Sequence, residues 1–171
     1  MSIALLVARL ILGLGLSAHG AQKLFGWFGG YGPAGTGGFF ENSLGFRPGI
    51  AFAVAAGLGE FLGGLLVATG SLGPIGPGLM IVVMMTAILT VHFGKPFFVD
   101  KGGPELPLMY AAGALTFAFV GFGAYSLDSA LGLNILASDG ARWIVVGIAV
   151  VLGCINYAIS KMPGSRPVPV P

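Results

Sequence analysis

Four ionisable side chains stand inside or at the ends of long apolar stretches, and they are the residues best suited to chemistry: Arg9, His19, Glu60 and His92. An ionised group in hydrocarbon costs several kcal/mol unless it is paired or reaches water, so such residues mark functional sites by default. Imidazole titrates near neutral pH, which suits the two histidines to exchange protons with a bound ligand. The set therefore favours ion pairing and proton transfer inside a membrane.

The composition places these residues in a membrane protein. The chain has 171 residues, of which 56% are hydrophobic and only 8% are charged, whereas charged residues make up about 25% of a typical soluble protein. Its few basic residues are scattered, so nucleic-acid binding is excluded. A single cysteine, Cys154, excludes an intrachain disulfide or dithiol pair. The sequence has no flavin or nucleotide motif, so redox catalysis would need the cofactor of a partner.

Five apolar segments are long enough to cross a bilayer as helices, which takes about 20 mainly apolar residues. They are residues 3–28, 50–70, 75–93, 106–125 and 143–160. We therefore expect an all-α transmembrane bundle, in which the last segment only just spans. Residues 36–46 fit either a short helix on the membrane surface or a flexible loop. The Pro-rich tail, residues 163–171, is expected to be disordered.

Basic residues predict the orientation of this bundle. With five spans, the following fall on one side: Lys23, Arg47, Lys95, Lys101, Lys161 and Arg166. Among the loops on the other side, only the one that contains Arg142 carries a basic residue. The positive-inside rule then places the C-terminus in the cytoplasm and the N-terminus outside.

The second segment carries small residues on adjacent stripes. They recur at four-residue spacing, with Glu60 within one stripe: Ala53 and Gly57; Ala56 and Gly64 on either side of Glu60; Gly59 and Gly63. Helices in lipid approach closely along such seams. We therefore expect this segment to be central to the bundle. In the last segment, Cys154 and Asn156 are interpreted as helix contacts.

Helical rise predicts that Arg9 and Glu60 meet. At 1.5 Å per residue, Arg9 lies about 9 Å and Glu60 about 15 Å from the same membrane face, a gap that an arginine side chain can bridge. We expect an intramembrane ion pair, either direct or through a water or a polar ligand group. The alternative is that the pair only fixes the register of the two helices.

The same estimate brings both histidines to the opposite membrane face. The candidate ligand-binding residues there are His19, Gln22, Lys23, His92, Glu105 and Tyr110. Such groups can bind and protonate a redox-active headgroup such as a quinone. Each histidine, taken alone, also fits an interfacial residue whose polar groups already have partners. Tyr110 also fits a residue of the aromatic belt at the membrane surface. No metal site is expected, because the chain has neither a haem attachment motif nor a histidine pair at helical spacing.

Several stretches resemble the DoxX family of small bacterial integral membrane proteins. They are Arg9 to Gly26, which includes His19, Gly20, Gln22 and Lys23, and then Phe39–Gly45, Gly57–Gly64 and Tyr125–Asp128. The resemblance covers roughly residues 5–131. It implies a four-helix bundle with links to thiosulfate:quinone oxidoreduction and to oxidative-stress or thiol-redox assemblies. The positions that match its motif are Arg9, His19, Gln22, Lys23 and Glu60.

The resemblance divides the chain into a DoxX-like bundle (1–131), an additional transmembrane helix (132–162) and the tail (163–171). It favours a quinone-linked redox or accessory role in an electron-transfer assembly of the bacterial inner membrane, with a quinone held non-covalently. The alternative is a non-catalytic subunit that stabilises a larger membrane complex, such as a respiratory one. A small-molecule carrier is disfavoured, because the chain breaks lie between helices. The expected partners are the bilayer and either other membrane subunits or copies of this chain.

Overall fold

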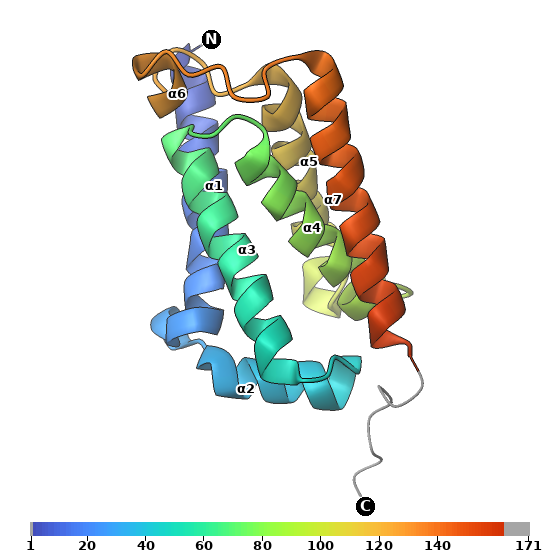
Figure 1. Cartoon of the computed structure of the whole chain (residues 1–171). Helices are drawn as coiled ribbons and strands as arrows, with labels where there is room; N and C mark the ends of the chain where they lie inside the picture. The colour runs from blue at the N-terminus through green and yellow to red at the C-terminus, as the bar shows by residue number, and fades with distance from the viewer. Residues whose placement is uncertain (1, 163–171) are drawn as a thin grey trace, which may run out of the picture.

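A computed structural model describes residues 2–162, and within this range the chain forms helices joined by turns. The bundle consists of α1 (Ser2–Phe25), α3 (Gly49–Thr69), α4 (Ile75–Ala87), α5 (Glu105–Val120) and α7 (Asp139–Ser160), side by side in Figure 1. The shorter elements are η1 (Trp27–Gly29), α2 (Gly32–Phe39), η2 (Phe40–Leu44), η3 (Ile88–His92), η4 (Val99–Lys101) and α6 (Leu127–Ala130). The predicted all-α bundle is confirmed. The tail predicted to be disordered lies outside the described residues.

Four helices in the described range are long and apolar enough to cross a membrane. They are Ile3–Phe25, Gly49–Thr69, Ile75–His92 (α4 continued by η3) and Asp139–Ser160. The fourth predicted span is shorter than expected: α5 ends at Val120, because Gly121 adopts a positive φ of 79°. The last span is longer than expected, because the Ser138 hydroxyl accepts a hydrogen bond from Ala141 N and starts α7 at Asp139.

Small residues bring α1 and α3 into backbone contact. A Cβ atom added at Gly64 would lie 2.5 Å from Ser17 Oγ, and one added at Gly13 would lie 2.5 Å from Gly64 O. Ser17 Oγ donates across this seam to Phe61 O at 3.0 Å. Its small residues thus mark a close helix seam, and α3 also packs against α2 and α4. The more central helix of the bundle is α4, which packs against α3, α5 and α7.

The connection between α1 and α3 is helical rather than a flexible loop. After Gly26, whose φ is +70°, α2 and then η2 run across the end of the bundle (Figure 1). The Glu41 carboxylate holds the chain where it turns from η2 into α3. It accepts a hydrogen bond from the backbone N of Gly49, the first residue of α3, at 3.0 Å. We call the end of the bundle that α2 and η2 cross the cavity end. The opposite end, near the N-terminus, is the Arg9 end.

The described basic residues that were predicted to share one side all belong to segments at the cavity end. Lys23 closes α1, Arg47 precedes α3, Lys95 follows η3, Lys101 precedes α5 and Lys161 follows α7. The side of the membrane that this end faces stays a prediction.

Candidate cavity at one end of the bundle

A cavity of about 890 Å³ lies at the cavity end, between the bundle and the crossing segments α2 and η2. Most of its wall is apolar or aromatic, and includes Phe39, Phe40, Phe46 and Phe52. Its polar and charged side chains come from α1, the residue before α2, α2, α3, α4, η3, α5 and α7: His19, Gln22, Lys23, Tyr31, Thr36, Glu60, Thr86, Thr90, His92, Tyr110 and Asn156. Binding cavities for small molecules typically combine such an apolar wall with a few polar groups.

The charged part of the cavity is an ion pair between Lys23 and Glu60. Lys23 Nζ lies 2.5 Å from Glu60 Oε2, and the side chains are 23% and 6% exposed. The sequence permits this contact because Gly57, one turn before Glu60, leaves room for Lys23: a Cβ added at Gly57 would lie 3.2 Å from Lys23 Cβ. Within the described range, Glu60 Oε1 accepts no further hydrogen bond. The carboxylate therefore keeps acceptor capacity.

His19 and Tyr110 stand beside this ion pair. Their rings meet edge to face, with centroids 6.0 Å apart and planes at 86°. A Cβ added at Gly15 would lie 2.7 Å from the Tyr110 hydroxyl, so glycine lets the phenol approach the α1 backbone. Neither the imidazole nor the phenol hydroxyl hydrogen-bonds to another described residue. Both groups therefore remain available to a ligand.

Two other predicted residues line the cavity but are already engaged by the backbone. His92 Nδ1 lies 2.7 Å from Gly102 O, and Gln22 Nε2 donates to Phe28 O at 3.3 Å. Glu105, in contrast, is not among the residues that line the cavity. Its Oε2 accepts a hydrogen bond from Val99 N at 2.9 Å and so closes the turn before α5.

Arg9 and Glu60 do not form the expected pair, because each has a different partner. Arg9 donates to Thr69 O at 3.3 Å and to Tyr125 O, while Glu60 binds Lys23. Arg9 is only 3% exposed, and its Nε has no hydrogen-bond partner among the described residues. Gly70, with a φ of +67°, leaves space for the guanidinium, because a Cβ there would overlap Arg9 Nη1.

The Arg9 end is further tied by Asp128. Its two carboxylate oxygens accept hydrogen bonds from Leu72 N at 2.9 Å and Gly73 N at 2.7 Å. Asp128 N in turn donates to Gly70 O at 3.0 Å. Arg9 and Asp128 therefore join the α3–α4 turn to the segment after α5.

Sequence reasoning missed a group of polar residues on the part of the cavity wall formed by α4, η3 and α7. Asn156 on α7 was interpreted as a helix contact, and it does contact α4, because its Nδ2 donates to Thr86 Oγ1 at 3.1 Å. It also lines the cavity, as do Thr86 and Thr90. The available signal was an amide within an apolar span, but only the packing of α7 against α4 shows which way it faces.

Comparison with known proteins supports the resemblance noted in the sequence. A sequence model of the DoxX family matches residues 4–93, more than half of the chain. The match runs from α1 to the residue after η3, and so contains Arg9, His19, Lys23, Glu60 and His92 but neither α5 nor α7. No curated protein and no solved structure matches the chain. With its membrane-spanning helices, this chain belongs to the DoxX family of membrane proteins.

Proposed function

We propose that the protein binds a quinone headgroup in the cavity and serves a quinone-linked redox or accessory role. The observation that carries the proposal is the convergence of Lys23, Glu60, His19 and Tyr110 on one part of a cavity whose remaining wall is largely apolar. A lipid-soluble ligand with a polar head matches this division of the wall.

The volume and lining of the cavity fit such a ligand. Pockets for small molecules and cofactors span about 300–1,000 Å³, and this cavity measures about 890 Å³. Aromatic side chains such as Phe40 and Phe46 offer faces and edges to a flat ring. The lysine, the imidazole and the phenol offer hydrogens to the oxygen atoms of the ring.

The chain's own residues would bind the head and exchange protons with it. A bound quinone supplies a couple that takes up two electrons and two protons. His19 carries a ring nitrogen that can donate or accept a proton, and Lys23 and Glu60 hold opposite charges beside it. Electrons would come from a partner, because the sequence carries no nucleotide or flavin motif.

Quinone binding is tested with protein purified in detergent or in nanodiscs. Titration with decylubiquinone, followed by quenching of the Trp27 and Trp143 fluorescence, is expected to saturate. Tyr110→Phe and His19→Leu are each expected to weaken binding roughly three- to tenfold, the effect of one lost hydrogen bond. Tyr125→Phe is the matched control, since the exposed Tyr125 side chain lies outside the cavity.

The result also separates the two functions. Saturable binding that depends on His19 and Tyr110 supports the quinone-linked role. If binding does not saturate, or if Tyr125→Phe weakens it as much as Tyr110→Phe, the proposal fails and the non-catalytic subunit becomes the better hypothesis. In that case, changes on the outer face of α7 should dissociate the protein from its complex.

A further inference from the structure

Asn156 places an amide on the cavity wall from within a largely apolar helix. It lies in α7, is half-buried and lines the cavity. Its Nδ2 donates one hydrogen to Thr86 Oγ1 at 3.1 Å. Among the described residues, its Oδ1 accepts no hydrogen bond. An amide has two N–H hydrogens and an acceptor oxygen, so one donor and the acceptor remain free.

Close packing of α7 on α4 holds this amide in place. A Cβ added at Gly153, one turn before Asn156, would lie 2.6 Å from Met85 Cβ. Near the other end of the contact, a Cβ added at Gly78 would lie 2.8 Å from Val145 Cγ1. Because a glycine on each helix lies against a side chain of the other, the two helices pack closely and α7 forms part of the cavity wall.

Thr86 orients the amide but has little to offer a ligand. Its hydroxyl donates its only hydrogen to Val82 O at 2.8 Å and accepts from Asn156 Nδ2. The neighbouring Thr90 hydroxyl likewise donates to Thr86 O at 2.7 Å. The free donor on this wall is therefore the amide of Asn156.

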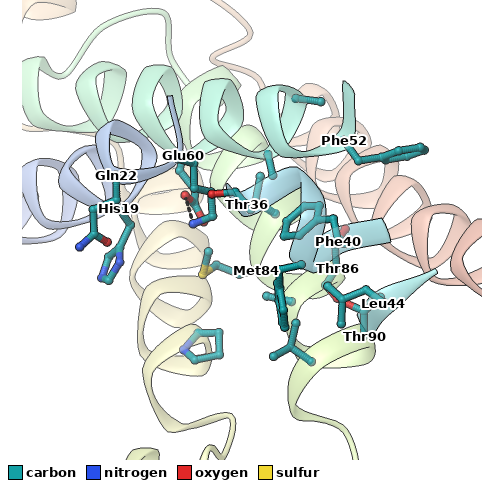
Figure 2. Close-up of a pocket in the computed structure, with 18 of the residues that line it drawn as sticks. His19, Gln22, Thr36, Phe40, Leu44, Phe52, Glu60, Met84, Thr86 and Thr90 are labelled. Atoms are coloured by element: carbon teal, nitrogen blue, oxygen red, sulfur yellow. Dashed lines mark hydrogen bonds and ion pairs between the residues drawn. The ribbon is translucent and has the colours of Figure 1, made fainter. Parts of the chain in front are cut away.

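Polar groups lie on both sides of the cavity. Figure 2 shows His19 and Gln22 on one side and Thr86, the partner of Asn156, on the other, with Met84, Phe40, Glu60 and Thr36 between them. A ligand with one polar group would use only one of these sides. A flat head with oxygen atoms at opposite positions of the ring would use both.

We propose that Asn156 is a second anchor for the ligand and selects heads that hydrogen-bond at two opposite ends, as para-quinones and their quinols do. This inference rests on the proposed function and deepens it. An amide donates to the carbonyl of the oxidised form and accepts from the hydroxyl of the reduced form, so one side chain serves both forms. The helix outside the family match thereby sets the specificity of the cavity.

The test compares two probes on the purified full-length protein. Decylubiquinone carries oxygen atoms at both ends of its ring, whereas 4-decylphenol carries one hydroxyl. Asn156→Leu is expected to weaken decylubiquinone binding roughly three- to tenfold, the effect of one hydrogen bond, and to leave 4-decylphenol binding unchanged. Thermal unfolding establishes that the variant is folded, and Asn156→Ala, which adds no bulk, replaces it if it is not.

Thr86→Val separates a role in binding from a role in helix packing. This variant also breaks the Asn156–Thr86 hydrogen bond but keeps the amide. Because Thr86 orients the amide, we expect Thr86→Val to weaken decylubiquinone binding, but less than Asn156→Leu does. The inference is overturned if Asn156→Leu leaves decylubiquinone affinity unchanged, weakens both probes equally, or matches Thr86→Val. If the wild-type protein binds neither probe saturably, the proposed function fails first, so the two failures are distinguishable.

Discussion

At the Arg9 end, a buried guanidinium is held by the backbone carbonyls of Thr69 and Tyr125, whereas at the cavity end a buried carboxylate is held by the side chain of Lys23. Backbone carbonyls move only with the main chain that carries them, so Arg9 acts as a structural tie between α3 and the segment after α5. A flexible lysine, itself 23% exposed, can shift to a ligand or to water. Two buried charges in one bundle thus have different tasks, and the type of partner distinguishes them.

The largest expected effect comes from breaking the α1–α3 seam that connects the two ends. Gly64→Val would press a side chain into Ser17, and overpacking of this kind costs about 3 kcal/mol or more where backbone must move. Unfolding in detergent should show this loss. Gly147→Ala is the control, because a Cβ at Gly147 meets nothing within 4 Å, and it should raise stability by about 0.5–1 kcal/mol. Equal effects at both glycines would contradict the backbone contact.

The next largest effect on stability comes from breaking the Lys23–Glu60 ion pair, and it should differ between the two partners. Lys23→Met leaves the nearly buried Glu60 carboxylate without a partner and should cost about 3 kcal/mol. Glu60→Gln leaves an ammonium group that reaches water and should cost only about 1 kcal/mol. Chemical unfolding measures both, and the double variant should regain much of the loss from Lys23→Met. Equal losses in the two single variants would argue against the difference in burial.

Removing the Arg9 side chain at the Arg9 end should lower the stability of the protein without changing ligand affinity. Arg9→Leu deprives two carbonyl groups of their donor and should cost about 2 kcal/mol, since each hydrogen bond to a charged group contributes about 1.5–3 kcal/mol and burial of the charge offsets part of that. Decylubiquinone affinity of the folded variant should stay within twofold. A large loss of affinity would show that the two ends are coupled.

The smallest effect concerns Asp128. Asp128→Asn keeps one acceptor oxygen for Leu72 N or Gly73 N and loses the other, which should cost about 1 kcal/mol because these groups are partly exposed. Thermal unfolding should show the shift, and Asp100→Asn, whose side chain is 66% exposed, should show none. A loss as large as that of Arg9→Leu would make Asp128 an equal part of the tie.

Periodicity and composition predicted the bundle and the end at which the polar residues gather. Long apolar segments become helices because lipid offers the backbone no partners, and antiparallel order brought His19, Lys23 and His92 to one end. The small residues of α3 likewise predicted the seam. These signals depend on local chemistry, which a single sequence displays.

The Arg9–Glu60 pair was mispredicted because the register of α1 and α3 depends on contacts between them. The depth estimate assumed that α1 begins and the antiparallel α3 ends at the same depth. In the structure, Gly13 lies against Gly64 and Ala68, so Arg9 comes level with Thr69. Thr69 is nine residues from Glu60 along α3, or about 13 Å, beyond the reach of the arginine. Glycine-to-glycine contacts set this shift, and no pattern within either helix encodes it.

The unequal lengths of α5 and α7 have a consequence for the surrounding lipid. At 1.5 Å per residue, the 16 residues of α5 cover about 24 Å and the 22 residues of α7 about 33 Å, against a hydrocarbon thickness of about 30 Å. The helix α5 alone is too short to cover that thickness, whereas α7 is long enough. Lipids with shorter acyl chains are therefore expected to match the α5 side of the bundle better than the α7 side, which would make the stability of the protein depend on the chain length of the host lipids.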